Sequence, residues 1–257
     1  MNTDIDWNTV KFRASSWGNL LAEPQSKADK DAGRLGVTCQ KELIKIYNQV
    51  KYGRKKEIVT KQMEKGKLAE EDSITLYSRV EKKLYLKNEE QLENEWFCGH
   101  PDIFIGDNIL NAEEVSDIKT SWSLDTFMPT LIEEPDRGYV AQLNVYFSLT
   151  GAQCGAIVYC LVDCPVSILF EESEWLLRKG SFISKESPDY LLAWEELQQN
   201  LVFPDIDYRE RVIKQPVERD DVLIEKMKMK VPIFRKWLAE FEEKHMNQYK
   251  KLNNAYK

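Results

Sequence analysis

The stretch Gly99-His100-Pro101-Asp102 decides the fold together with Asp117-Ile118-Lys119, which follows a little further along the chain. Ile103 and Ile105 alternate with Asp102 and Phe104, and residues 115–119 alternate again, which is the pattern of two short strands. Gly106-Asp107-Asn108 lies between them and has the composition of a turn. The sequence therefore predicts an antiparallel hairpin.

This hairpin would bring charged side chains to one point. If it closes near residues 109–110, Asp102 lies across from Asp117, and the two-residue period of a strand puts Lys119 on the same face as Asp117. Two half-buried carboxylates repel each other, and a hard divalent ion such as Mg²⁺ removes that conflict. The lysine could then orient or deprotonate a metal-bound water for attack on a phosphodiester. A surface hairpin with solvated charges is the alternative.

A helix predicted over residues 60–80 carries an acidic residue on its apolar face. Glu70 shares that face with Met63, Ile74 and Tyr77, at helical offsets. A carboxylate on an inward face needs a partner, and a metal ion at the hairpin would supply one. The alternative is that Glu70 sits at the edge of the apolar stripe and pairs with a lysine.

A second helix and a buried strand are expected after the hairpin. Apolar residues recur at helical spacing in residues 136–150, where Gln142 and Tyr146 lie one turn apart on the same face as Tyr139. Residues 156–162 form a continuous apolar run, as a buried strand does. Residues 120–134, between Lys119 and this helix, are expected to form a loop that could line a substrate channel. The order of elements predicts an α/β fold with a central mixed sheet.

Composition sets limits on the class of protein. The chain has 257 residues, of which 42% are hydrophobic, and seven tryptophans, so it can bury a large core. It has no run of eighteen apolar residues, and its first ten residues are polar and acidic, so neither a membrane span nor a signal peptide is expected. The five cysteines are odd in number and scattered, which favours a reducing, cytoplasmic compartment.

The charge is unevenly distributed along the chain. The net charge is −7, yet residues 1–67 contain fourteen Lys and Arg against eight Asp and Glu. A basic first quarter would suit a face that contacts phosphates, and a solvated helix surface is an equally good interpretation. Its basic residues include Lys51, Arg54, Lys55, Lys56, Lys61, Lys65 and Lys67.

The two ends of the chain are predicted to be mainly helical. Ser15 or Ser16 is a suitable N-cap for a short helix, and with the nearby Arg13 it would form an anion site for a DNA phosphate, although ordinary capping explains the serine equally well. Residues 37–52 fit a helix that ends at a glycine. Residues 190–201 and 219–249 also have helical patterns, the second broken or restarted at Pro232, and we expect this tail to pack on the core rather than to serve subunit contacts.

These motifs, in this order, resemble the PD-(D/E)xK nuclease superfamily: Gly-x-Pro-Asp, Asp-x-Lys and Gln-x-x-x-Tyr. Within it the chain is most similar to lambda-exonuclease-type and YqaJ-type viral recombination nucleases. Residues 12–24 resemble the N-terminal helix of that family, where a serine and an arginine hold the 5′-phosphate of DNA, and residues 66–76 resemble its helix with a metal-site glutamate. The chain departs from the lambda type at Asp117, where that type has glutamate. RecB-type nucleases share several of these elements.

The resemblance implies a restriction-endonuclease-like α/β core, a central mixed sheet flanked by helices. It implies one nuclease domain over residues 1–257, with the core at about 11–165 and a C-terminal helical extension at about 188–257. It also implies a role for each motif residue. Glu70, Asp102, Asp117 and the Ile118 carbonyl would bind Mg²⁺ or Mn²⁺, Lys119 would position the attacking water, Gln142 and Tyr146 would brace the site or touch the strand, and Arg13, Ser15 and Ser16 would hold the terminal phosphate.

The function implied by the resemblance is a phage-type 5′–3′ exonuclease on double-stranded DNA, acting in recombination and repair. A homo-oligomeric ring, a trimer in that family, and a single-strand annealing protein as partner are further implications. Three alternatives remain: a RecB-type single-strand exonuclease, a restriction-like endonuclease, and a non-catalytic DNA-binding scaffold.

Overall fold

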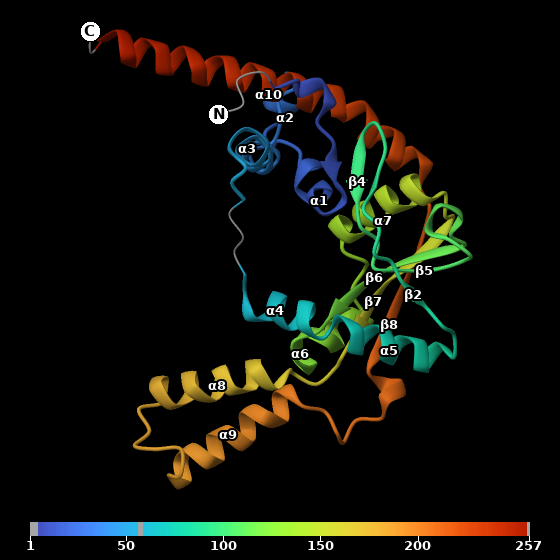
Figure 1. The fold of residues 1–257 in the computed structure, drawn as a ribbon, viewed down its shortest axis with the longest axis vertical. Helices are drawn as coiled ribbons and strands as arrows, with labels where there is room; N and C mark the ends of the chain where they lie inside the picture. Colours follow the sequence, from blue (N-terminus) through green and yellow to red (C-terminus); the bar gives the residue numbers. More distant parts are fainter. Residues whose placement is uncertain (1–4, 56–58, 256–257) are drawn as a thin grey trace.

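The fold is built around a five-stranded mixed sheet in the order β2-β5-β6-β7-β8 (Figure 1). The computed structural model describes residues 5–55 and 59–255, with side chains described through residue 249. Strand β6 pairs antiparallel with β5 and parallel with β7, and β8 pairs antiparallel with β7. The strands are β2 (Leu86–Lys87), β5 (Ile103–Ile105), β6 (Glu114–Thr120), β7 (Cys154–Cys160) and β8 (Val212–Glu218).

The predicted hairpin is confirmed as β5 and β6. Ile103 pairs with Ser116, so Asp102, one residue earlier, lies across from Asp117. Gly106 adopts φ of 139° in the connection, a conformation that favours glycine, and a short 3-10 helix, η3 (Ile109–Asn111), completes the connection. The sequence pattern thus determined both strands and their register.

Helix α7 (Arg137–Thr150) connects the parallel strands β6 and β7, as predicted. Asp136 caps its first turn by accepting hydrogen bonds from the backbone N–H groups of Gly138 and Tyr139. Gly151 ends the helix in the left-handed conformation, with φ of 84°. The residues between β6 and α7, expected to form a loop, contain two short helices, α6 (Leu124–Phe127) and η4 (Met128–Leu131).

A smaller sheet, which the sequence did not indicate, joins the N-terminus to the strand before the hairpin. Its order is β1-β4-β3, and β1 is parallel to β4, with Arg13 beside Cys98. This pairing therefore places the N-terminal segment beside β4, the strand that ends shortly before Asp102. Its strands and the neighbouring helices are β1 (Phe12–Arg13), β3 (Leu92–Glu93), β4 (Phe97–Gly99), η1 (Trp7–Thr9), η2 (Ala14–Ser16), α1 (Trp17–Leu20) and α2 (Lys27–Asp31).

The helix predicted over residues 60–80 is two helices. The preceding helix, α3 (Val37–Tyr52), ends at Gly53 as expected. Helix α4 (Lys61–Leu68) ends before Ala69, and α5 (Glu70–Glu81) begins after it. Because of this break Met63, on α4, is 61% exposed, while Ile74 and Tyr77, on α5, are buried. The expected face shared by Glu70 and Met63 is therefore wrong, whereas the alignment with Ile74 and Tyr77 lies within one helix.

The C-terminal third contributes a strand that the sequence pattern did not indicate. β8 adds to the edge of the central sheet, so the sheet includes residues well beyond 165. Helices α8 (Val166–Lys179) and α9 (Pro188–Leu201) form a hairpin that projects from the sheet (Figure 1). Helix α10 (Asp221–Ala255) continues through Pro232, so the expected break there is wrong. A short 3-10 helix, η5 (Tyr208–Glu210), precedes β8.

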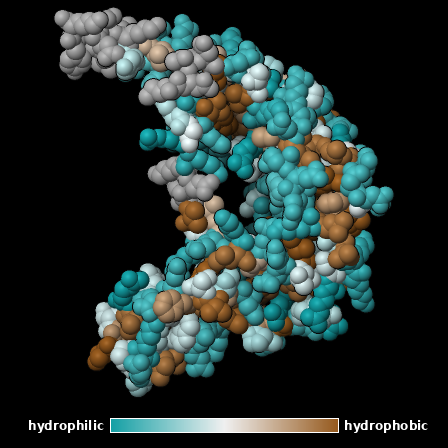
Figure 2. All heavy atoms as spheres, viewed as in Figure 1, coloured by the Kyte–Doolittle hydropathy of each residue, from teal (hydrophilic) through white to brown (hydrophobic). Residues whose placement is uncertain are grey.

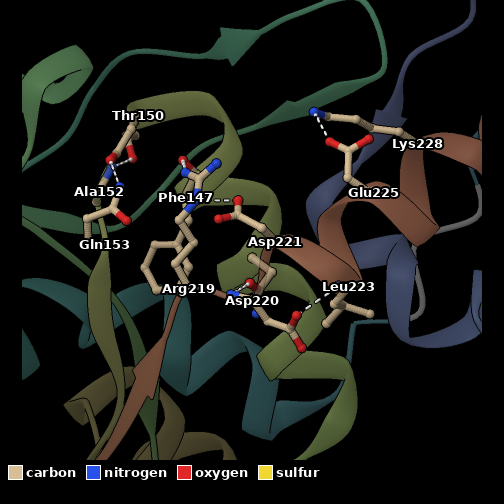
Figure 3. A network of polar contacts seen from close by, with 12 residues as sticks. Phe147, Thr150, Ala152, Gln153, Arg219, Asp220, Asp221, Leu223, Glu225 and Lys228 are labelled. Carbon is tan, nitrogen blue, oxygen red and sulfur yellow. Dashed lines mark hydrogen bonds and ion pairs between the residues drawn. The ribbon is translucent and has the colours of Figure 1, made fainter.

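Helix α10 packs against the core, as predicted for the tail. Its buried apolar residues join the same core cluster as Phe12 and Trp17 at the N-terminus. The turn into α10 also holds α7 (Figure 3): Arg219 donates a 2.7 Å hydrogen bond to the Phe147 carbonyl, and the Asp220 N–H donates a 2.7 Å bond to Asn144. The buried apolar residues of α10 are Ile224, Met227, Val231, Phe234 and Leu238.

The elements enclose a hollow on one side of the molecule. Figure 1 shows a C-shaped outline, with the α8–α9 hairpin as one arm and α3 with the end of α10 as the other. Figure 2 shows mainly hydrophilic side chains around this hollow. Within the described residues, no helix combines the length and apolar character needed to cross a membrane.

Candidate active site

The site is centred on Asp117, a carboxylate buried in the middle of β6. Its residue is 1% exposed. Oδ1 accepts a 2.8 Å hydrogen bond from Gln142 Nε2 on α7. Oδ2 lies 2.6 Å from Lys119 Nζ in an ion pair and accepts no hydrogen bond of normal geometry. Lys119 therefore lies on the same face of β6 as Asp117, as the two-residue period of the strand predicted. Gln142 reaches the same carboxylate from α7.

The second carboxylate, Asp102, approaches from the start of β5. Its Oδ2 accepts a 2.7 Å hydrogen bond from the backbone N–H of Ile118. Burial raises the pKa of Asp102 well above its usual value, and the nearby Asp117 charge raises it further, while the Ile118 N–H and Lys119 act in the opposite direction. The two acidic groups thus repel each other in a water-poor environment.

Lys119 lies between Asp117 and an aromatic ring. Its Nζ is 4.1 Å from the ring centroid of Tyr139, and its side chain is 25% exposed. Burial lowers the pKa of Lys119, but the Asp117 carboxylate outweighs burial, so the net shift is upward. The side chain is therefore held as an ammonium between the Asp117 carboxylate and the Tyr139 ring.

Tyr146 completes a chain of hydrogen bonds behind Asp117. Gln142 Nε2 lies 2.8 Å from the Tyr146 hydroxyl. Burial, followed by the Asp117 and Asp102 charges, raises the pKa of Tyr146. A Cβ atom at Gly99 would come within 2.8 Å of the Tyr146 ring, so the glycine of the Gly-x-Pro-Asp motif is required for close packing against this tyrosine.

Glu70 lies at the edge of the site rather than inside it. Its carboxylate is 3.3 Å from Lys87 Nζ, and its side chain is 33% exposed. Its charge nevertheless contributes to the raised pKa of Asp102. Among the described residues, no three His, Cys, Asp or Glu side chains are gathered as ready ligands for one metal ion. The structure therefore brings together Asp102 and Asp117, and it leaves Glu70 paired with a lysine.

The predicted phosphate-binding residues have mixed surroundings. Arg13 is exposed, and its positive charge offsets a small part of the rise in the pKa of Tyr146. Ser15 is also exposed. Ser16 makes no capping hydrogen bond, and its hydroxyl instead donates a 3.0 Å bond to Glu42. The expectation that this serine caps the helix is therefore wrong.

The basic first quarter is only partly a surface. Lys65 is completely buried, and Lys51 forms a 2.5 Å ion pair with Glu242. These two lysines do not form the free phosphate-contacting face expected for them. Arg54 and Lys67 are exposed, whereas Lys56 lies outside the described residues.

Three neighbours of the site have no motif of their own. Tyr139 lies under Lys119, Lys87 pairs with Glu70, and Glu42 holds Ser16. Of these three residues, only Tyr139 could be placed near the site from the sequence, because it lies three residues before Gln142 on the same face of a helix. The other two contacts join distant parts of the chain, so no local pattern indicates them.

The residues present fit a hard divalent ion. Asp102 and Asp117 are oxygen donors of the kind that Mg²⁺ prefers, and the Asp117 Oδ2 has no hydrogen bond of normal geometry. Two close carboxylates, one with a raised pKa, form an environment that a cation stabilises. This donor set suits metal-assisted chemistry on a phosphate ester.

The fold is that of a class of exonucleases. The chain superposes on a phage-related exonuclease from Haemophilus somnus 129PT with a TM-score of 0.71 and 24% identity, over 92% of this chain and 97% of that one. It also superposes on LHK-Exo, an alkaline exonuclease from Laribacter hongkongensis, with a TM-score of 0.60 and 15% identity, over 96% and 98% of the two chains.

LHK-Exo in complex with dAMP matches equally well, with a TM-score of 0.60 and 17% identity over 94% of each chain. No family model matches the sequence, and no curated protein is significantly similar to it. At these identities the likeness establishes the fold. The predicted α/β architecture with a central mixed sheet, and the predicted resemblance to phage-type exonucleases, are confirmed at that level.

Proposed function

We propose that this protein is a divalent-metal-dependent deoxyribonuclease that digests duplex DNA from its 5′ ends. The observation that carries the proposal is the meeting of Asp102, Asp117 and Lys119 at neighbouring strands, with Gln142 bonded to Asp117. The likeness to exonuclease structures over nearly the whole chain supports the same reading.

In this proposal the metal ligands are Asp102, Asp117, the Ile118 carbonyl and Glu70. A bound Mg²⁺ or Mn²⁺ supplies positive charge to the phosphate and acidifies a bound water. Glu70 joins the site by exchanging its ion pair with Lys87 for the metal. Gln142 keeps the Asp117 carboxylate in a fixed orientation through its hydrogen bond to Oδ1.

Lys119 positions the attacking water in this proposal. The Asp117 carboxylate and the Tyr139 ring hold its ammonium in place. Because the pKa of Lys119 is shifted upward, the lysine donates hydrogen bonds to the water and the phosphate rather than accepting a proton.

The proposed polarity follows from the N-terminal segment. Arg13 and Ser15 would hold the terminal 5′-phosphate, and Ser16 would join them by releasing Glu42. The dAMP complex of LHK-Exo supports a deoxynucleoside monophosphate as product, which stepwise removal of nucleotides produces. A role in recombination and repair in the cytoplasm of a bacterial or phage-infected cell agrees with this activity.

Two kinds of partner belong to the proposal. We expect a ring-shaped homo-oligomer, a trimer, that encloses the duplex, and a single-strand annealing protein that takes up the strand left by digestion. Light scattering coupled to gel filtration tests the first, since a monomer at micromolar concentration contradicts it.

The experiment that tests the function uses linear duplex DNA labelled separately at each 5′ and 3′ end. We expect digestion that starts at 5′ ends in Mg²⁺ or Mn²⁺, stops in EDTA, and falls about 10²–10⁴-fold in Lys119→Ala. The control is Lys179→Ala, which changes a lysine at the end of α8 that is not part of the proposed site and should retain activity.

Other outcomes separate the alternatives. Cleavage of closed circular DNA would indicate a restriction-like endonuclease, and preference for single strands would indicate a RecB-type enzyme. Absence of cleavage on every DNA in both metals, with DNA binding retained, would overturn the enzyme and leave a binding scaffold.

A further inference from the structure

Lys65, on α4, is a buried lysine that the proposed chemistry does not use. It is completely buried, and it is among the largest side chains to be so. Its Nζ donates hydrogen bonds to the carbonyls of Ser121, at 2.8 Å, and Trp122, at 3.0 Å. It also lies 5.5 Å from the Phe203 ring centroid and 5.9 Å from that of Trp122. These partners are carbonyls and rings rather than a carboxylate.

Burying a lysine ammonium costs free energy, and the contacts of the buried group must offset this cost. An ammonium loses its hydration on burial, and neutral carbonyls replace only part of it. Burial accordingly lowers the pKa of Lys65 to about 8. The two carbonyls that it binds directly follow the end of β6, which carries Asp117 and Lys119. The lysine therefore attaches α4 to the exit of that strand.

A second polar contact attaches α5 to the same place. Ser73 Oγ lies 2.9 Å from Thr120 Oγ1, the last residue of β6. The break between α4 and α5 falls at Ala69, between the two attachments. Glu70 is the first residue after the break, so it lies between an anchor five residues earlier and another three residues later.

We infer that Lys65 is a positioning residue that, together with Ser73, fixes the position of Glu70 relative to Asp117. In that position Glu70 can share a divalent metal ion with Asp102 and Asp117. The inference rests on the proposed function. The direct ion pair between Glu70 and Lys87 is partly exposed, and exposed pairs hold a side chain only weakly. The buried anchors on both sides of Ala69 therefore determine where the Glu70 backbone lies.

The test measures Mn²⁺ binding by the intact protein without DNA, from the electron paramagnetic resonance signal of free Mn²⁺. Lys65→Met keeps the buried stem and removes the donor. We expect the Mn²⁺ dissociation constant to rise 10–100-fold, the range seen when groups that orient metal ligands are removed. Ser73→Ala should change it in the same direction by a smaller factor.

The matched control is Glu172→Gln. Glu172, on α8, forms a 2.6 Å ion pair with Lys61, the first residue of α4. This ion pair attaches the N-terminal end of α4 to α8 rather than to β6. This variant should lower thermal stability but leave the Mn²⁺ dissociation constant within about twofold of the wild type. Thermal melts of all three variants give the loss of stability for comparison.

The outcomes are separable. Mn²⁺ affinity that is unchanged in a folded Lys65→Met variant overturns the inference, and so does an equal loss in Glu172→Gln, because the effect would then follow general destabilisation. If Lys65→Met does not fold, an unchanged affinity in Ser73→Ala overturns it as well. A wild-type protein that binds no Mn²⁺ overturns the proposed metal dependence instead.

Discussion

Gln142 donates a 2.8 Å hydrogen bond to Asp117, and this polar contact joins the crossover helix α7 to the middle of the central sheet. The same amide nitrogen lies 2.8 Å from the Tyr146 hydroxyl. Because Asp117 is buried, the direction in which its carboxylate points depends on this bond and on Lys119. Helix α7 thereby helps to fix the orientation of the Asp117 carboxylate.

Gln142→Leu should reduce activity. The substitution leaves Asp117 Oδ1 and the Tyr146 hydroxyl without this partner, which should cost about 1–3 kcal/mol of stability. A carboxylate that is free to turn should also weaken metal-supported cleavage about 10–100-fold. Cleavage rates as a function of Mg²⁺ concentration measure this, and Gln199→Leu, an exposed glutamine on α9, is the control. An unchanged Mg²⁺ dependence would contradict the bracing role of Gln142.

Asp102→Asn should stabilise the metal-free protein at neutral pH. The pKa of Asp102 is raised by burial and by Asp117, so the folded state holds a proton more tightly than the unfolded state does. The free energy of unfolding therefore falls as the pH rises from the unfolded pKa of Asp102 through its folded pKa, and the penalty is complete above that value. Asparagine carries no such charge and keeps an acceptor for the Ile118 N–H.

We expect Asp102→Asn to raise Tm by roughly 2–4 °C at pH 7 in EDTA, the shift that about 1 kcal/mol produces. The gain should shrink as the pH is lowered through the titration of Asp102, and added Mg²⁺ should stabilise the wild type more than the variant. Differential scanning calorimetry over a pH series measures both effects. A lower Tm for the variant at neutral pH would show that repulsion between the two carboxylates is not significant.

Tyr139→Leu and Tyr139→Phe should separate two effects of one side chain. The ring of Tyr139 lies 4.1 Å from Lys119 Nζ, a contact that depends on the aromatic face rather than on the hydroxyl. The phenylalanine variant should retain nearly full activity, whereas the leucine variant should lose about 5- to 30-fold, equivalent to roughly 1–2 kcal/mol. The rate of DNA cleavage measured over a range of pH tests this. Loss of the ring leaves the Lys119 ammonium less constrained, so the dependence of the rate on pH should also change. Equal activity of both variants would argue against the contact.

Arg219→Ala should destabilise the fold without changing the site. Arg219 donates a 2.7 Å hydrogen bond to the Phe147 carbonyl at the end of α7, as Figure 3 shows. Removing a charged donor from this largely buried position should cost roughly 1.5–3 kcal/mol. Lys228→Ala, also in Figure 3, breaks an ion pair with the exposed Glu225 and a contact with the Trp96 ring, 4.7 Å from the ammonium, and should cost less, about 1 kcal/mol. Urea denaturation of both variants measures the difference, and equal losses would refute it.

Much of the architecture follows from local pattern. The alternation along residues 102–105 and 115–119 predicted β5 and β6 and their register, and the helical period predicted α7. The same patterns were misleading where a break depends on packing. Helix α4 separates from α5 at Ala69, and Lys65 and Ser73 on either side of this break are bonded to residues at the end of β6. Helix α10 continues through Pro232 with its apolar residues packed on the core. Strand β8 was not predicted because it forms by pairing with β7, which lies more than fifty residues earlier in the chain.

By itself, the sequence determined that Asp102, Asp117 and Lys119 meet, because strand period and hairpin register depend only on neighbouring residues. It also placed Gln142 and Tyr146 on one helical face. Only the tertiary structure decided what surrounds them: Tyr139 under the lysine, Glu70 drawn to Lys87, and Lys65 buried rather than solvated. The physical reason is that burial and long-range ion pairs depend on which surfaces meet on folding, and the local order of residues does not encode this.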